Sequence, residues 1–210
     1  MNGSAALFQA IESTIDEHRE ELDRLDAVAG DGDHGATMVM GWRAVNRAVD
    51  SAGLQTDAET VRVAAHAFAS VGGSIGPLWG TALLRAARTL DGADAGDPRT
   101  ICDAIAAAVD GIAERGRSQE GDKTLLDVVG PSSRELTRRV RQGETLEQAL
   151  AAVAAYAADR ASATQELTPR RGRARRLAER SLGHVDPGAA SAALIWRVGA
   201  EFLDGRTQHA

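Results

Sequence analysis

The sequence has few aromatic residues, a single cysteine and no long hydrophobic run. Aromatic side chains make up 3% of the 210 residues, so we expect a core built from Ala, Leu, Val and Ile. Cys102 alone forms neither a disulfide framework nor a thiolate metal cluster. Neither a membrane span nor a signal peptide is recognisable, and the net charge of −6 gives no general attraction to nucleic acid or anionic membranes. These absences predict a cytoplasmic protein.

Helix-forming residues dominate, and hydrophobic residues recur at the spacing of amphipathic helices. An Ala-rich chain with few strand-like runs predicts an all-α fold. Short loops, with no internal repeat or linker, predict a single domain over residues 1–210. We expect eight helices, the sixth of them begun or kinked at Pro131. Their approximate ranges are 4–25, 35–50, 57–70, 77–90, 99–116, 125–141, 144–164 and 189–203.

Three carboxylates lie within eight residues of the segment Asp26-Ala-Val-Ala-Gly-Asp31-Gly-Asp33-His34-Gly35. Close carboxylates repel one another, and a hard divalent cation such as Mg²⁺ balances them. The glycines allow the tight turns that bring Asp26, Asp31 and Asp33 together. Residues 33–37 have the pattern of a helix start, whose amide groups attract phosphate. The segment predicts a metal–phosphate site, although a helix cap with a turn of solvated acids fits the same spacing.

Two other motifs fit this segment less well. The string Gly30 to Gly35 matches G-x-G-x-x-G, but no β-branched strand precedes it, and the intervening Asp would repel a pyrophosphate unless a metal intervened. An EF-hand loop counted from Asp31 would place Gly35 at position five and Trp42 at position twelve. Neither a dinucleotide fold nor an EF-hand is therefore expected.

Further loops carry residues that suit an anionic ligand. The loop Val71-Gly-Gly-Ser-Ile-Gly-Pro77 precedes a helix start, so it predicts either a phosphate cradle of backbone amides or a tight helix–helix turn. It is not a Walker A loop, because no Gly-Lys-Ser/Thr follows. The basic run over residues 168–176 suits either anion contact or a solvated loop. Gly121-Asp-Lys-Thr124 is a polar loop, and Asp186-Pro-Gly188 is typical of a turn.

Together these loops favour a Mg-nucleotide site, and at this point the chain resembles the L subunit of dihydroxyacetone kinase, the nucleotide-binding half of that enzyme. The resemblance covers almost the whole chain. It is carried by five motifs in order: Asp26 with Gly30-Asp-Gly-Asp-His-Gly35, Val71-Gly-Gly-Ser-Ile-Gly-Pro77, Gly121-Asp-Lys-Thr124, Gly172-Arg-Ala174 and Glu179-Arg-Ser-Leu-Gly-His-Val-Asp-Pro-Gly-Ala189.

The resemblance implies an antiparallel eight-helix barrel that binds Mg-ADP or Mg-ATP at one end. It implies that Asp26, Asp31 and Asp33 hold magnesium, with two ions expected. The residues that it places along the nucleotide are His34, Gly35, Ala36, Thr37, Ser74, Ile75, Gly116, Leu125, Arg173, Asp186, Pro187 and Gly188.

The resemblance also implies phosphoryl transfer to dihydroxyacetone or a related ketose such as erythrulose, held covalently by a histidine of a separate K subunit. Neither His34 nor His184 is then the sugar-binding histidine. The donor is ATP, or a bound ADP that a phosphotransferase-system protein recharges, and the lack of an evident insertion favours the second scheme. A homodimer is expected. The alternative function is a Mg-nucleotide sensor without transfer activity, because the family's L subunit also contacts a transcription regulator.

Three positions depart from the family pattern. Ile75 replaces a small hydroxyl residue, which removes a side-chain donor beside the phosphates. Arg175 and Arg176 stand where Ser and an aromatic residue are more usual, which affects the nucleotide cover or the partner surface. The related fatty-acid kinase domains carry Asp-Gly-Asp-Thr-Gly, so His34 and the Gly183-His-Val-Asp-Pro-Gly188 loop favour the ketose branch.

Overall fold

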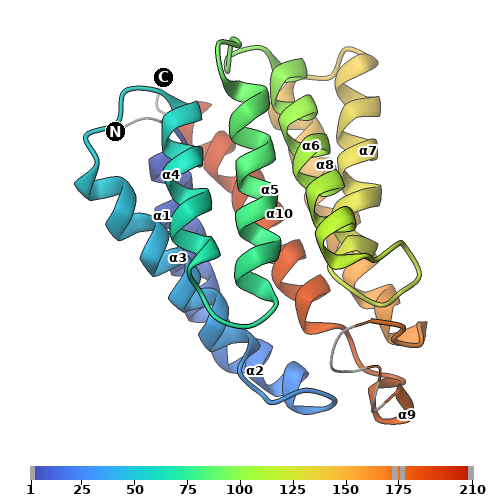
Figure 1. The fold of residues 1–210 in the computed structure, drawn as a ribbon. Coiled ribbons are helices and arrows are strands. Elements are labelled where there is room, and N and C mark those ends of the chain that lie inside the picture. The colour runs from blue at the N-terminus through green and yellow to red at the C-terminus, as the bar shows by residue number, and fades with distance from the viewer. Residues whose placement is uncertain (1–2, 172–174, 176–177, 208–210) are drawn as a thin grey trace.

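The computed structural model describes residues 3–171, 175 and 178–207, and every regular element in these ranges is helical (Figure 1). The all-α prediction is confirmed. The elements are α1 (Gly3–Glu17), α2 (Arg19–Ala27), α3 (His34–Ser51), α4 (Asp57–Ala69), α5 (Ile75–Leu90), α6 (Pro98–Gly116), α7 (Leu126–Arg141), α8 (Leu146–Ala163), the 3₁₀ helix η1 (Thr164–Glu166), α9 (Ala178–Ser181) and α10 (Pro187–Thr207).

The long helices pack side by side in chain order and close into a ring. Each long helix contacts the next one in the order α1, α3, α4, α5, α6, α7, α8 and α10, and α10 in turn contacts α1. α2 continues the line of α1 and contacts α3 and α10. Successive long helices run in opposite directions (Figure 1). With α1 and α2 counted as one rod, this closed circuit is the arrangement that an antiparallel eight-helix barrel requires.

The first predicted helix, over residues 4–25, is divided in the structure. α1 ends at Glu17 and α2 begins at Arg19, while His18 between them has φ −100° and ψ 9°. The amide of His18 still donates to Thr14 O and that of Leu22 to His18 O, and the His18 ring Nδ1 also lies 2.9 Å from Thr14 O. The division is therefore a bend at one residue. The short elements η1 and α9 were not predicted, because a single turn carries no hydrophobic period.

The sixth predicted helix begins before its proline. α7 starts at Leu126, and Pro131 lies inside it. Proline has no N–H group, so the carbonyl of Asp127, four residues earlier, loses its usual helical donor. The Nε of Arg160, on α8, lies 3.4 Å from that oxygen and donates to it. A side chain from the neighbouring helix thus replaces the missing backbone bond.

The core forms two clusters of different composition. The cluster between α1, α3, α4 and α5 contains four aromatic rings: Trp42 contacts Phe8, Phe68 and Trp79, and Phe68 contacts Trp79, with centroids 5.2 to 6.0 Å apart. The cluster between α6, α7, α8 and α10 is mainly Ala, Leu, Val and Ile, joined by Trp196. The expectation of a core built from Ala, Leu, Val and Ile holds for most of the buried residues, but it missed the aromatic group of the first cluster, which holds four of the seven aromatic residues.

The two ends of the barrel differ in what their loops contain. α3, α5, α7 and α10 begin at the lower end of Figure 1, so four loop segments far apart in sequence meet there. At the upper end, α4 and α8 begin with capping boxes formed by Thr56 and Thr145, and the Asp97 side chain caps α6. Among the described helices, none has the length and hydrophobicity needed to cross a bilayer.

Candidate functional site

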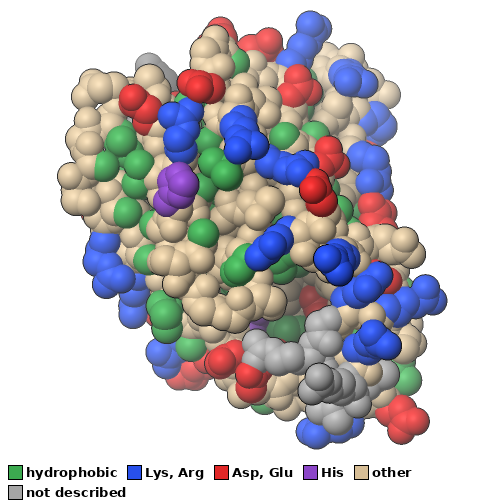
Figure 2. Space-filling view, in the orientation of Figure 1, with side chains coloured by type: hydrophobic (Ala, Val, Ile, Leu, Met, Phe, Trp, Pro, Cys, Tyr) green, Lys and Arg blue, Asp and Glu red, His purple; other side chains and the backbone are tan. Residues whose placement is uncertain are grey.

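A cavity of about 510 Å³ opens where these four loop segments meet. The same region is visible as a hollow in the lower half of the space-filling view (Figure 2). Nine of the residues predicted to bind metal or nucleotide line it: Asp26, His34, Ser74, Ile75, Gly116, Leu125, Asp186, Pro187 and Gly188. The fold therefore brings together residues that the sequence separates by as many as 162 positions, from Asp26 to Gly188.

The three aspartates of the acidic loop converge at one side of this cavity. One carboxylate oxygen from each of Asp26, Asp31 and Asp33 lies within 4.8 Å of the others. Asp26 is in the last turn of α2, and its Oδ2 accepts from the amides of Gly32, at 2.9 Å, and Asp33, at 3.1 Å. The loop is thus wrapped around Asp26, which fixes that carboxylate relative to the two exposed ones.

Gly30 makes this wrapping possible. A Cβ atom at position 30 would lie 2.2 Å from the Oδ1 of Asp26, so any side chain there would displace the carboxylate. The donor set is three hard oxygen ligands with no nitrogen or sulfur donor, which suits Mg²⁺ and leaves coordination positions for water and phosphate oxygens. The residues present therefore fit the predicted magnesium ion.

His34 connects the start of α3 to α10. Its Nε2 lies 3.0 Å from the Oγ of Ser191, which itself donates to the carbonyl of Gly188 at 3.0 Å. Because the single hydroxyl proton is used in that bond, His34 Nε2 is the donor and its Nδ1 carries the lone pair. Burial lowers the pKa of His34 to about 4, against the opposing attraction of Asp26 and Asp23, so the ring is neutral at pH 7.

The rest of the first turn of α3 lies behind His34. Gly35 is buried against α2, since a Cβ there would lie 2.2 Å from the carbonyl oxygen of Arg19. The Ala36 amide donates to Asp23 Oδ1 at 3.0 Å, and that of Thr37 donates to Asp33 O. Gly35, Ala36 and Thr37, predicted to follow the nucleotide, are next to the cavity in sequence but are not part of its lining.

The glycine loop leads directly into α5 at the cavity wall. Ser74 is exposed and immediately precedes Ile75, the first residue of α5. No side-chain cap hydrogen bond is formed at this helix start, so within the described structure its amides are not covered by a local side chain. Ile75 packs against the aromatic core cluster. Its side chain offers no donor, so any polar contact from this position comes from the backbone.

The loop between α6 and α7 supplies the opposite wall through Gly116 and Leu125. Its shape is held by Asp127, whose Oδ1 accepts from the Gly121 amide and whose Oδ2 accepts from the Thr124 amide at 2.8 Å. Lys123, on the same loop, lines the cavity and is 3% exposed. Burial lowers the pKa of its amine, and the charge of Asp186 opposes that shift.

Asp186, Pro187 and Gly188 form the start of α10. The Asp186 carboxylate accepts from the Ala189 amide at 2.8 Å, and Pro187 occupies the first helical position. The expected turn is therefore a helix cap. Burial raises the pKa of Asp186 to about 7, and Asp127 adds to the shift, while the bond from Ala189 and the charge of Lys123 oppose it.

The basic segment is only partly described. Arg171 lines the cavity, and its Nε lies 3.3 Å from Asp122 Oδ2. Arg175 is exposed. Arg173 and Arg176, on which two of the predictions fall, lie outside the described residues. In the space-filling view, basic side chains gather on the right-hand side, over α6 and α7 (Figure 2).

Several cavity residues were missed by sequence reasoning. Arg115 and Ser191 line the cavity and lie in no predicted motif, whereas Lys123 and Arg171 lie in loops expected to contribute to the nucleotide site but were not named as site residues. Lys123 carried a further signal, because it is the only lysine in the sequence. The other residues are an arginine among many, or a serine in a hydrophobic helix.

Comparison with known proteins gives a consistent result. The DAK2 domain model matches residues 28–201. D-erythrulose kinase of Mycolicibacterium smegmatis is 40% identical over 207 residues, which cover 97% of this chain and 36% of that protein. The ADP-binding subunit DhaL of PEP-dependent dihydroxyacetone kinase 1 from Listeria innocua is 34% identical over 183 residues, covering 87% of this chain and 86% of that one.

A solved structure shares the fold. The dihydroxyacetone kinase of C. freundii superposes with a TM-score of 0.75 at 25% identity, covering 96% of this chain and 34% of that one. The chain therefore spans about a third of the length of the kinases that it matches, and most of the length of the DhaL subunit.

Proposed function

Because the chain belongs to the DAK2 domain family, we propose that it is the Mg-nucleotide-binding phosphotransferase unit of a ketose kinase. The observation that carries the proposal is the convergence of Asp26, Asp31 and Asp33 at the edge of a cavity lined by nine predicted site residues. Magnesium bound there, as two ions by our expectation, would neutralise charge on the phosphates during transfer.

The residues of the chain itself would bind and orient the nucleotide. Ser74 and Ile75 line the cavity at the start of a helix, where amide groups suit phosphate oxygens. Arg115, Lys123 and Arg171 add cationic side chains to a wall that also contains Asp26 and Asp186. Gly116 and Leu125 offer a less polar surface for the base. This division of polar and apolar walls is what a nucleoside diphosphate requires.

The acceptor would be a ketose held outside this chain. Three longer relatives are named as erythrulose kinases, the longer C. freundii structure is a dihydroxyacetone kinase, and relatives of similar length are named as ADP-binding subunits of dihydroxyacetone kinases. Since this chain spans about a third of the longer relatives, we propose that a K subunit or an equivalent domain holds dihydroxyacetone or erythrulose. Transfer assays with a supplied K subunit and each ketose would identify the acceptor.

The phosphoryl donor follows from how the nucleotide is held. A PEP-dependent relative of similar length supports a bound ADP that a phosphotransferase-system protein recharges, and soluble ATP is the other scheme. Mass spectrometry of nucleotide released from protein desalted in Mg²⁺ separates them. Near-stoichiometric ADP supports recharging, whereas an empty protein that binds Mg-ATP supports the ATP scheme. A protein that binds neither would overturn the proposal.

Two further outcomes bear on partners. Mg-nucleotide binding without any transfer to ketose, with a K subunit present, would favour the sensor function instead. The expected homodimer remains a prediction, which light scattering coupled to size-exclusion chromatography checks directly.

A further inference from the structure

Lys123 is an unusual residue in this sequence. The chain contains 24 Lys and Arg residues, and Lys123 is the only lysine among them. It is also buried, with 3% of its surface exposed, although lysine is among the residues most rarely buried. A chain that uses arginine for every other cation thus has its one compact ammonium group at the cavity wall.

The backbone at this position is also unfavourable for a side chain. Lys123 has φ +59°, a left-handed conformation that glycine adopts without steric cost and that other residues adopt rarely. The same loop also has a positive φ at Gly121, +89°, and there the residue is a glycine. A lysine retained at such a position, rather than a glycine, points to a role for its side chain.

The contact made by that side chain joins two loops. Lys123 Nζ donates to the carbonyl oxygen of Ser181 at 2.6 Å, in a buried bond between residues 58 positions apart. The His184 amide donates to the same oxygen at 3.2 Å. Asp186 lies close enough to attract the ammonium. Because Ser181, His184 and Asp186 all line the cavity, the lysine supports the wall that leads into α10.

Asp122 makes a second connection beside it. Its carbonyl oxygen accepts from the Arg170 amide at 3.0 Å, and its Oδ2 pairs with Arg171 Nε at 3.3 Å. The same Oδ2 accepts from the Gln119 amide at 3.0 Å, so the carboxylate is fixed on its own loop. Asp122 and Lys123, which are adjacent on the α6–α7 loop, therefore bind two separate places in the later part of the chain: Asp122 binds Arg170 and Arg171, and Lys123 binds Ser181.

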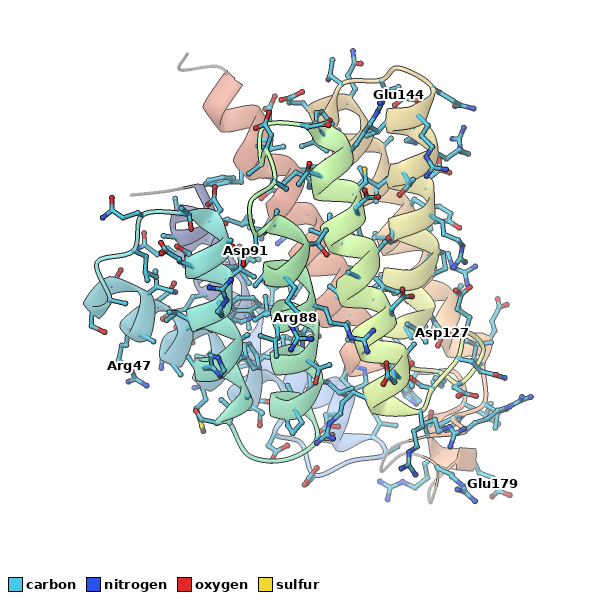
Figure 3. All side chains as sticks on the ribbon, turned by 45° about the horizontal axis from the view of Figure 1, so that its top comes forward. Arg47, Arg88, Asp91, Asp127, Glu144 and Glu179 are labelled. Carbon is cyan, nitrogen blue, oxygen red and sulfur yellow. The ribbon has the colours of Figure 1, made fainter. Side chains whose placement is uncertain are left out.

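The α6–α7 loop itself rests on α7. Asp127 accepts two of its amides, and it is 1% exposed. Figure 3 shows Asp127 and Glu179, on α9, toward the same end of the barrel, with Glu144 at the opposite end. The support for the wall thus runs from α7 through the loop to Lys123. A guanidinium group would be larger and planar, whereas an ammonium donates from a single point to a nearby carbonyl.

We propose that Lys123 is the positioning residue of the nucleotide site, and that its ammonium group holds the Ser181–Asp186 wall against the α6–α7 loop so that a nucleoside diphosphate can bind between them. The inference rests on the proposed function, since it assigns a role within the same cavity.

The single lysine makes a direct test possible. Protein grown with [¹⁵N]lysine, carrying a tag without lysine, has one side-chain Nζ resonance that needs no assignment. We expect this signal to shift when Mg-ADP is added to saturation, because the wall that the ammonium holds then contacts the nucleotide. An unchanged Nζ signal in protein saturated with Mg-ADP would overturn the inference, even if no variant folds.

Variants measure the size of the effect by isothermal titration calorimetry. Lys123→Met should weaken Mg-ADP binding by about tenfold or more, since a hydrogen bond from a charged group is lost. Lys123→Arg should recover part of the affinity. Lys123→Gly relieves the backbone conformation yet removes the amine, so it should bind as poorly as Lys123→Met.

A matched control separates this role from general support of the loop. Arg134 holds the same loop from outside through a two-point bond to Glu120, and its side chain is 66% exposed. Arg134→Met should leave the affinity for Mg-ADP within about twofold. Wild-type affinity in Lys123→Met or Lys123→Gly would overturn the inference, and so would equal losses in Lys123→Met and Arg134→Met. If wild-type protein itself failed to bind Mg-ADP, the proposed function would fail first.

Discussion

The two ends of this barrel are built from the same helices, yet they use their polar groups differently. At the upper end, α4 and α8 begin with complete capping boxes and α6 with an aspartate cap followed by proline. At the lower end, within the described residues, the N-cap residues of α3 and α5 make no side-chain cap hydrogen bond, whereas the first amide of α7 donates to Thr124 Oγ1 at 3.2 Å and α10 is capped by Asp186. The cavity opens at the lower end.

The difference shows how one fold separates stability from binding. Local caps satisfy the first amides of helices at the upper end, which stabilises the barrel. At the lower end, acidic residues from other segments support the loops: Asp23 holds the first turn of α3, Asp26 the acidic loop and Asp127 the α6–α7 loop. Loops held from behind in this way keep their front surface available for a ligand. Substitutions at the two ends should therefore have opposite consequences.

Removing a metal ligand should have the largest effect. In Asp31→Ala, one of three converging carboxylates is lost from an exposed position, so Mg-ADP affinity should fall by more than about 100-fold with little change in helix content. Calorimetry and circular dichroism measure both. Asp50→Ala, an exposed aspartate at the opposite end of α3, is the control and should bind normally. Unchanged nucleotide affinity in Asp31→Ala would defeat the assignment of the metal site.

Displacing a metal ligand indirectly should have the next largest effect. In Gly30→Ala, the added Cβ would clash with Asp26 Oδ1, so Mg-ADP affinity should fall by about tenfold and stability by about 1–3 kcal/mol. Gly199→Ala on α10 is a matched control, because its Cβ meets no atom within 4 Å. That variant should keep its affinity and gain about 0.5–1 kcal/mol of unfolding free energy.

A pair of hydroxyl substitutions tests the comparison of the two ends directly. Thr145→Ala breaks a capping box at the upper end and should cost about 1 kcal/mol of unfolding free energy without changing Mg-ADP affinity. Ser74→Ala at the cavity should do the reverse, with affinity lowered about threefold to tenfold and stability nearly unchanged. Denaturant unfolding gives the unfolding free energy of each variant, and calorimetry gives its affinity for Mg-ADP. Loss of stability in Ser74→Ala equal to that in Thr145→Ala would remove the distinction.

The smallest expected effect is a pH dependence at the start of α10. Burial raises the pKa of Asp186 to about 7 from an ordinary value of 3.8, so between these values the folded state binds more protons than the unfolded state. This group should therefore lower stability as pH rises from about 4 to about 7. In Asp186→Asn that slope should disappear, so the variant should gain unfolding free energy relative to wild type at pH 8 compared with pH 5. Thermal unfolding of wild type and Asp186→Asn at pH 5 and pH 8 measures this. A stability difference between the two proteins that is the same at both pH values would contradict the prediction.

Sequence reasoning predicted the helical fold because it depends on local patterns, and the resemblance to a known family supplied nine of the residues that line the cavity. Asp26 lies in a short motif whose metal-binding chemistry is readable without knowing its neighbours, whereas Ser74 and Gly188 were placed at the nucleotide by the resemblance. The bend at His18 and the donor from Arg160 to Asp127 depend on tertiary packing, which a linear pattern does not contain. The aromatic cluster was missed for the same reason, since its four rings come from four helices. The role of Lys123 required both its contact with Ser181 and its uniqueness in the chain.

Hydrogen–deuterium exchange with and without Mg-ADP reports on both ends of the barrel in one experiment. We predict slower exchange on binding in four segments at the cavity end, residues 26–36, 71–78, 116–125 and 181–189. The turns at the opposite end, residues 52–56, 91–97 and 142–145, should exchange at unchanged rates. Protection of those turns, or no protection at the cavity end in protein that binds Mg-ADP, would contradict the account.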